Sequence, residues 1–358
     1  MTKTSWELYT GNEEGWSAML DACAQAKESI DLEQFIFMTD SVGQRFIDTC
    51  AKKAKEGVKV RFLWDAAGSF SFYGSTVIEE LKDKGIELVF FKTLFPSFLK
   101  YHDYKSWYLR NHRRTLVIDG KIGFTGSICF SNEMINWRDT VVKIEGPVVN
   151  EMLYEFNVMW QRALKEPISY DKSEIVDSEF EYVTNYPLPR RHNLYKEIIR
   201  AIRDAKDYVY ITTPYFVPTR HLSRVIRASA KRGVDVKIII PESSDHPIVD
   251  MCSRSFFTKM LKAGVKIYLY RGKMIHSKTI VIDDSWSTIG TLNLDTASLI
   301  YNFEANIVTT NLKFTEELKE HFEVDLLETR EITYKEWNSR FWLEKLFGSF
   351  ARLLRDFM

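Results

Sequence analysis

Apolar and polar residues alternate along the chain in two stretches that share one order of elements. Short apolar runs rich in β-branched and aromatic residues predict strands, and amphipathic segments between them predict helices. In the first half the predicted strands are Ser29–Phe37, Val58–Asp65, Glu87–Lys92, Thr115–Asp119 and Thr140–Glu145. In the second half they are Tyr208–Phe216, Val234–Pro241, Val265–Tyr270, Thr279–Asp283 and Glu304–Thr310, with helices such as Asn193–Ala205 and Pro247–Ala263. This alternation predicts an α/β fold.

The two halves also resemble each other in sequence. KKAKEGVKVRFLW, residues 52–64, parallels ASAKRGVDVKIII, residues 228–240, because each ends a polar helix at a glycine and enters an apolar strand. HRRTLVIDGKIGFTGS, residues 112–127, parallels HSKTIVIDDSWSTIGT, residues 276–291, with His, Asp and Gly repeated at one offset. Such self-similarity predicts two similar lobes. We expect them to pack face to face, with the functional site at the seam between them. The expected division is 1–164, first lobe; 165–191, a polar, proline-containing linker; 192–333, second lobe; and 334–358, a C-terminal amphipathic helix.

Composition narrows the class of protein. The 358 residues are 45% hydrophobic and 27% charged, which is typical of a globular chain with a sizeable core. The formal net charge is zero, so a global attraction to nucleic acid is absent. The four cysteines form no CxxC pair and predict no zinc site. The sequence has no run of 18 or more apolar residues and predicts no membrane-spanning helix, and residues 1–16 do not have the pattern expected of a signal peptide.

The repeated histidines are the candidate chemistry. In an extended strand, residues two apart face the same side, so His112 projects with Arg114 and His276 with Lys278. An imidazole beside a cation, presented twice, suits a phosphate diester: one neutral imidazole attacks phosphorus and the other protonates the leaving oxygen. This chemistry needs no metal and no cofactor. Asp119 and Asp283 are also candidates, but their odd spacing of seven points them away from the imidazoles unless the strand bends, which makes them supports first and participants second.

These residues resemble the paired motif of the phospholipase D superfamily, H-x-K-x4-D followed by Gly-Ser/Thr-x-Asn. The second copy is intact in His276, Lys278, Asp283, Gly290, Thr291 and Asn293. The first copy departs from it twice, with Arg114 in place of Lys and Cys129 in place of Asn. Arginine keeps the charge but is larger, whereas cysteine cannot replace the amide donors. Asn132 lies three residues on and could take that place.

Within the superfamily the chain is most similar to the bacterial cardiolipin synthases. The matching runs include IDLEQFIF, NWRDTVVKIEGPVV, TTPYFVPT, SDHPIV and GTLNLDTASLIYNFEANIV. The resemblance implies two phospholipase D-type lobes packed pseudo-symmetrically and a phosphatidyltransferase that works through a phosphohistidine, with His112 as nucleophile and His276 as acid and then base. It further implies that Arg114, Lys278, Ser127, Thr291 and Asn293 hold or support phosphate oxygens, and that Asp139 and Glu304 orient the imidazoles. The alternative for each of these two carboxylates is a structural role, as a buried group that caps a helix or pairs with a neighbouring strand.

Two segments suggest contact with a membrane. Residues 342–358 place Trp, Phe and Leu on one helical face and charged residues on the other, as in a helix that lies in the bilayer interface. A helix docked on the protein's own core or on a dimer partner would show the same pattern. Residues 90–110 interleave aromatics with lysine and arginine, which suits an interfacial loop or the stacking of single-stranded bases. We expect a peripheral enzyme on the cytoplasmic face of the membrane, acting on a phospholipid such as phosphatidylglycerol.

Several functions remain open on this pattern. The first is phosphatidyl transfer that makes cardiolipin or a related phospholipid. A lipid hydrolase would use the same site with water as acceptor. Whether the phosphatidyl group passes to water or to an alcohol depends on the shape of the pocket and on how well it excludes water. A nuclease of the same superfamily is disfavoured by the neutral charge and the apolar C-terminus, so nucleic acid is not the expected partner. A weakened lipid-binding protein is suggested by Arg114 and Cys129.

Overall fold

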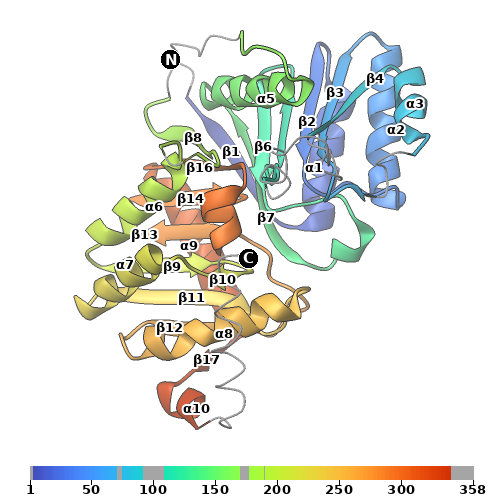
Figure 1. Ribbon diagram of the computed structural model, residues 1–358. Coiled ribbons are helices and arrows are strands. Elements are labelled where there is room, and N and C mark those ends of the chain that lie inside the picture. The colour runs from blue at the N-terminus through green and yellow to red at the C-terminus, as the bar shows by residue number, and fades with distance from the viewer. Residues whose placement is uncertain (1–2, 71–74, 92–108, 170–176, 189, 340–358) are drawn as a thin grey trace.

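The computed structural model describes residues 3–70, 75–91, 109–169, 177–188 and 190–339. These residues form two lobes, each built on one mixed sheet (Figure 1). The strands of the first sheet are β1 Ser5–Gly11, β2 Ser29–Gln34, β3 Lys59–Asp65, β4 Ile86–Phe91, β5 Thr115–Ile118, β6 Ile122–Gly126 and β7 Arg138–Glu145. Those of the second are β8 Phe180–Asn185, β9 Tyr208–Thr212, β11 Asp235–Pro241, β12 Lys266–Tyr270, β13 Thr279–Ile282, β14 Trp286–Gly290, β16 Glu304–Thr309 and β17 Thr329–Ile332. The α/β fold and the repeat of two similar lobes are therefore confirmed.

The two sheets share one strand order. The first runs β1-β7-β6-β5-β2-β3-β4, and the second runs β8-β16-β14-β13-β9-β11-β12-β17 when read from its other edge. In each sheet three strands are parallel, and a hairpin continues antiparallel to them: β5 and β6 beside β2, and β13 and β14 beside β9. The predicted strands match the observed ones within a few residues, apart from Tyr208–Phe216, which splits into β9 and the short β10, Phe216–Val217. Strand β10 pairs with β15, Leu294–Asp295.

The expected linker 165–191 differs from the structure over part of its length. Strand β8 lies inside it and pairs antiparallel with β16, as β1 pairs antiparallel with β7 in the first lobe. The second lobe therefore begins at Phe180 and not at residue 192. Its first strand was not predicted because it is short, lies at the edge of the sheet and mixes Glu181, Thr184 and Asn185 with apolar residues.

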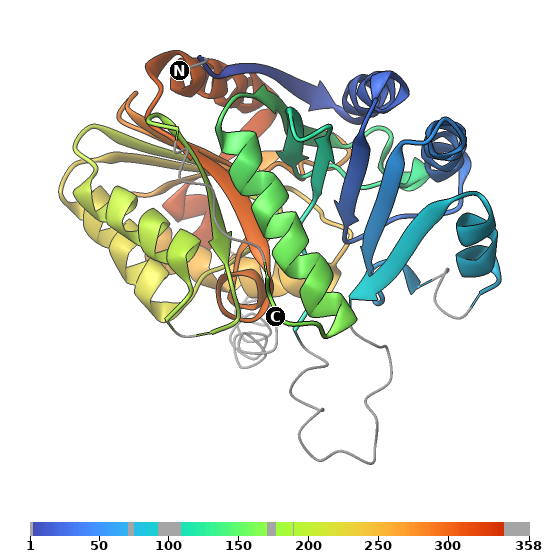
Figure 2. The same ribbon diagram turned by 90° about the horizontal axis from the view of Figure 1, so that it is seen from above.

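Helices cover both faces of each sheet (Figure 2). The outer faces carry α1 Asn12–Gln25, α2 Ser41–Lys55 and α3 Val77–Asp83 in the first lobe, and α6 Asn193–Asp204, α7 Arg220–Lys231 and α8 Pro247–Leu261 in the second. Between the sheets lie α5 Val148–Leu164 and α9 Leu312–Leu327. One continuous core takes Val142 and Met152 from the first lobe and Ile289, Ile307 and Phe314 from the second. Because this core is shared, the lobes pack as one body and hold their seam in place.

The segments expected to meet a membrane lie largely outside the described residues. These are 92–108, within the predicted loop 90–110, and 340–358, which includes the whole predicted amphipathic helix 342–358. Between Thr333 and Ser339 the chain forms a short helix, α10 Tyr334–Asn338. Among the described helices, none has the length and apolar character needed to cross a bilayer.

Candidate active site

The two histidine motifs are held at the seam by backbone pairing between lobes. His112 N donates to Phe303 O at 3.0 Å, and His276 N donates to Arg138 O at 2.8 Å. The residues just before the histidines, Asn111 and Ile275, form parallel bridges with Phe303 and Arg138. These two contacts are related by the repeat. Each lobe therefore fixes the backbone of the other lobe's histidine immediately before its short central strand.

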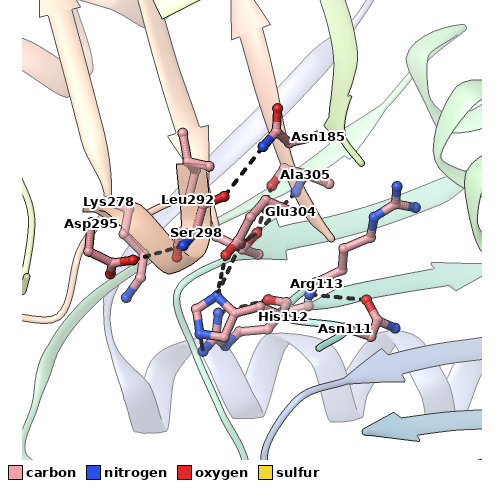
Figure 3. A network of polar contacts seen from close by, with 12 residues as sticks. Asn111, His112, Arg113, Asn185, Lys278, Leu292, Asp295, Ser298, Glu304 and Ala305 are labelled. Atoms are coloured by element: carbon pink, nitrogen blue, oxygen red, sulfur yellow. Dashed lines mark hydrogen bonds and ion pairs between the residues drawn. The ribbon is translucent and has the colours of Figure 1, made fainter. Parts of the chain in front are cut away.

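Each histidine is paired with a carboxylate from the opposite lobe. His112 Nδ1 lies 2.9 Å and 3.0 Å from the two carboxylate oxygens of Glu304, at the start of β16 (Figure 3). His276 Nδ1 lies 2.8 Å from Asp139 Oδ1, in β7. All four side chains are buried. A carboxylate on Nδ1 fixes the ring orientation and leaves Nε2 as the reactive nitrogen.

Arg114 fixes the proton on His112. Its Nη2 lies 3.0 Å from His112 Nε2. A guanidinium can only donate, so Nε2 accepts and the single proton of neutral His112 is on Nδ1, where it is donated to Glu304. Burial, with the charges of Arg114 and Lys278 as further causes, holds the pKa of His112 well below its usual value. The imidazole is therefore neutral and presents its lone pair toward the site.

Lys278 occupies the matching place beside His276. Its Nζ donates to the backbone oxygen of His276 at 2.6 Å. Burial and the charge of Arg114 lower the pKa of Lys278 to about 7. Burial and the charge of Lys278 likewise lower the pKa of His276 to about 4. The charges of Arg114 and Lys278 lower the pKa values of both imidazoles, so each cation acts electrostatically on both histidines.

The two carboxylates behave differently although the repeat relates them. Burial raises the pKa of Glu304 to about 8, against opposing hydrogen bonds from Thr291 and Ser298. Burial also acts to raise the pKa of Asp139, but the charge and hydrogen bond of His276 outweigh it, and that pKa falls well below its usual range. Near neutral pH, His276 thus has an ionised partner, whereas the partner of His112 tends to hold its proton. When the surroundings give two related groups such different pKa values, the difference indicates which of them supports an acid and which a base.

Thr291 and Ser127 lie behind the carboxylates. Thr291 Oγ1 donates to Glu304 Oε2 at 2.5 Å and accepts from Ala305 N at 3.0 Å. Ser127 Oγ donates to Thr140 O at 3.1 Å and accepts from Thr140 N at 2.9 Å. Of the two roles considered for these residues, phosphate contact and support, the geometry favours support.

The segment after each glycine motif differs between the lobes. Asn293 is buried, and its Oδ1 has no hydrogen-bond partner among the described residues. Rotation of the amide by 180° would present its NH2 there instead, as a phosphate oxygen requires. In the first lobe the matching residue, Cys129, accepts from Arg114 Nε at 2.9 Å. Asn132 is not its substitute, because its Oδ1 accepts from Ser41 Oγ and its N donates to Asp40.

The structure contradicts a catalytic place for Asp119 and Asp283. Asp119 follows β5 at the end remote from His112, and its carboxylate accepts from the backbone N of Lys27, Glu28 and Ser29 at 2.7–3.1 Å. Asp283 repeats these contacts with residues 206–208 at 2.7–2.9 Å. The extended strands β5 and β13 lie between each histidine and its aspartate, and at about 3.3 Å per residue seven residues span roughly 20 Å. These aspartates anchor the loops that precede β2 and β9.

Aromatic side chains that the sequence did not single out frame the imidazoles. Phe35 lies edge-on to His112, with ring centroids 4.8 Å apart. Trp137 and Tyr215 lie 5.2 Å and 6.5 Å from the ring of His276. Asp295 is also part of this site: its carboxylate accepts from Ser298 N at 2.7 Å (Figure 3), and its pKa is raised by burial to about 6. The signal that could have found Trp137 is its place two residues before Asp139.

Comparison with known proteins is consistent with this geometry. Residues 19–160 and 198–326 match the family described as "Cardiolipin synthase, PLD-like domain". Cardiolipin synthase 1 of Bacillus cereus is 31% identical over 98% of this chain and 72% of its own length. A cardiolipin synthase of Clostridium perfringens is 32% identical over 98% of this chain and 76% of its own length.

Solved structures resemble the chain in fold. Phosphatidylserine synthase of Haemophilus influenzae superposes with a TM-score of 0.75 at 14% identity, over 99% of this chain and 95% of that one. Polyphosphate kinase of Porphyromonas gingivalis gives 0.64 at 13% identity, over 99% of this chain and 54% of that one. The two lobes, the seam and the sequence match agree. The chain is an enzyme of the phospholipase D superfamily and belongs to its cardiolipin synthase family.

Proposed function

We propose that this enzyme transfers a phosphatidyl group from one phospholipid to the alcohol of another, with phosphatidylglycerol as donor and acceptor and cardiolipin as product. The observation that carries the proposal is the crossed pairing of His112 with Glu304 and of His276 with Asp139, with Arg114 at His112 and Lys278 at His276. The names of the relatives support the choice of substrate.

His112 is the proposed nucleophile. It is neutral, its proton is held on Nδ1, and its Nε2 lone pair faces the cations. Attack on phosphorus forms an N–P bond and breaks the bond from phosphorus to the head-group oxygen. Arg114 Nη2, which lies 3.0 Å from Nε2, would turn to a phosphate oxygen as the diester enters. A guanidinium is well suited to both contacts because its donors are arranged in a fork.

His276 is the proposed acid and then base. Its ionised partner Asp139 stabilises the imidazolium. Burial and the charges of Lys278 and Arg114 oppose that charge. The negative charge of the bound diester offsets both cations and so raises the pKa of His276 into the range where it can donate. His276 then protonates the leaving alcohol and later takes the proton of the entering one.

The phosphate is held by cations and a donor amide in this proposal. Lys278, Arg114 and Asn293 would contact its free oxygens, while Ser127, Thr291, Asp139 and Glu304 hold the imidazoles in place. We further propose that the enzyme acts at the cytoplasmic face of the membrane, with residues 90–110 and 342–358 at the lipid surface. The composition of those two segments is the support for that placement.

Incubation of the purified protein with phosphatidylglycerol vesicles tests the function. Cardiolipin and free glycerol are expected from the wild type, measured by mass spectrometry, and neither from His112→Ala or His276→Ala. Phosphatidic acid without cardiolipin would make the enzyme a hydrolase. Absence of any lipid product from the wild type would refute the proposal and leave lipid binding or action on another phosphodiester.

A further inference from the structure

A polar cluster lies on the His276 side of the site and takes no part in the proposed transfer mechanism. Tyr215 follows β9, and its ring lies 6.5 Å from that of His276. Its hydroxyl donates to Asp245 Oδ1 at 2.6 Å. His246 completes the cluster, with its ring 5.6 Å from that of Tyr215 and its Nε2 3.5 Å from Asp245. The loop between β11 and α8 is thereby tied to the active site.

This loop is held in shape yet exposes its functional groups. Ser244 N donates to Asp250 Oδ2 at 2.9 Å, and His246 N donates to Ser244 Oγ at 3.1 Å. The side chains of Asp245 and His246 are nevertheless 34% and 61% exposed. A carboxylate has room for several hydrogen bonds, of which Tyr215 takes one. The remaining acceptor positions of Asp245 are therefore directed to a ligand or to solvent.

The His112 side of the site carries a different aromatic contact. Phe35, a ring without a hydroxyl, lies 4.8 Å from His112, whereas Tyr215 brings a hydroxyl and a carboxylate to the His276 side. The two lobes are related by the repeat, so this contrast is a specific feature and not a consequence of the fold. Hydroxyl groups of a substrate are expected on the side of His276.

The chemistry of transfer leads to the same side. The leaving alcohol receives its proton from His276, and the entering alcohol gives its proton to the same nitrogen, so both occupy one place opposite His112. Building on the proposed function, we propose that Tyr215, Asp245 and His246 form the subsite for the polyol head group of the donor and, after it leaves, of the acceptor lipid. Asp245 accepts from a hydroxyl adjacent to the reacting one, and Tyr215 holds the carboxylate in place.

Transfer to the acceptor alcohol forms one bond to phosphorus and breaks another. The acceptor hydroxyl oxygen forms a bond to phosphorus, the bond from phosphorus to His112 Nε2 breaks, and the hydroxyl proton passes to His276 Nε2. A diol gains a second hydrogen bond to Asp245 that a simple monohydric alcohol cannot make. The subsite therefore selects among acceptors, and it favours an alcohol with a neighbouring hydroxyl over water or ethanol.

Competition between two acceptors in one vessel tests this. Phosphatidylglycerol vesicles serve as donor, with deuterated glycerol and ethanol as acceptors, and mass spectrometry gives the ratio of deuterated phosphatidylglycerol to phosphatidylethanol. Asp245→Asn is expected to lower that ratio roughly tenfold, the loss of about one charge-assisted hydrogen bond. Tyr215→Phe should lower the ratio by a smaller factor. This variant provides the test if Asp245→Asn is inactive.

Glu242→Gln is the matched control, because Glu242 lies in the same loop but faces Arg330 at 3.5 Å. Its ratio should equal that of the wild type. An unchanged ratio in both Asp245→Asn and Tyr215→Phe overturns the subsite, even if total turnover falls, since equal loss of both products indicates a structural role. Absence of both products from the wild type overturns the proposed function itself, and the subsite with it.

Discussion

His112 and Glu304 lie in different lobes, yet the histidine Nδ1 is 2.9 Å from the nearer carboxylate oxygen. His276 and Asp139 repeat this relationship in the opposite direction. Neither lobe therefore contains a complete histidine–carboxylate pair. The shared core between β6–β7 and β14–β16 is what keeps both pairs assembled, which makes packing at the seam a condition for catalysis.

The unequal pKa values of the two carboxylates predict unequal losses on amide substitution. Asp139→Asn should lower kcat by about 10² or more, because an ionised partner is needed for the His276 imidazolium. Glu304→Gln should cost less than about tenfold at pH 6.5, since Glu304, whose pKa is about 8, already holds its proton there. Steady-state kinetics on vesicles measure both. Comparable thermal denaturation of the two variants is the control, and the reverse order of losses would refute the assignment of roles.

Lys278 predicts a specific pH dependence. Its pKa is lowered to about 7, so the free enzyme loses this positive charge as the pH rises through that value, and attraction for the phosphodiester weakens. We expect kcat/KM to fall above about pH 7. The corresponding fall in kcat should occur at a higher pH, because bound phosphate stabilises the charged ammonium of Lys278. In Lys278→Arg the guanidinium stays charged, so the fall in kcat/KM near pH 7 should disappear. The rate of this variant should be lower than that of the wild type at every pH. A fall retained in that variant would mean another group is responsible.

Arg114 and Cys129 should behave as one unit. The thiol accepts from Arg114 Nε and takes less room than an asparagine, so the larger guanidinium reaches His112. Arg114→Lys and Cys129→Asn should each lower kcat/KM about tenfold. The double variant, which reproduces the Lys278–Asn293 pattern, should recover much of the loss, with a coupling energy of about 1–2 kcal/mol. Additive losses in this double-mutant cycle would show that the two departures are independent.

Asp119 should matter for stability and not for chemistry. Asp119→Ala removes the acceptor for the backbone N–H groups of Lys27, Glu28 and Ser29, and should lower the free energy of unfolding by about 1–2 kcal/mol. Those hydrogen bonds outweigh burial and lower the pKa of Asp119, so its contribution is present above the unfolded pKa and lost as the pH falls through the folded one. Urea denaturation measures the change. A large loss of kcat in well-folded Asp119→Ala would contradict this placement.

Much of the fold followed from local pattern. Buried parallel strands such as β3 and β11 are near-continuous apolar runs, and they were predicted within a residue or two. Edge strands β1 and β8 were not, because each is short and mixes polar with apolar residues without a continuous apolar run. Strand β6 was also missed, although Asp119-Gly120 is a turn dipeptide of the kind that joins hairpin strands, and both residues have positive φ.

The candidate site was predictable in its residues but not in its pairing. The repeat indicated His112 and His276, and the resemblance to the family indicated Asp139 and Glu304. Which carboxylate serves which histidine depends on how the lobes pack, and local sequence does not encode that contact. The misplacement of Asp119 and Asp283 has a similar cause, since a motif records which residues recur and not which end of a strand they occupy.

The most direct test of the mechanism is to find the residue that carries the phosphatidyl group. Wild-type enzyme is mixed with phosphatidylglycerol vesicles, quenched within milliseconds at alkaline pH to preserve phosphohistidine, and digested for mass spectrometry. The mechanism predicts a phosphatidyl adduct on the peptide that contains His112. An adduct on the peptide that contains His276 would contradict it and reverse the roles of the two histidines.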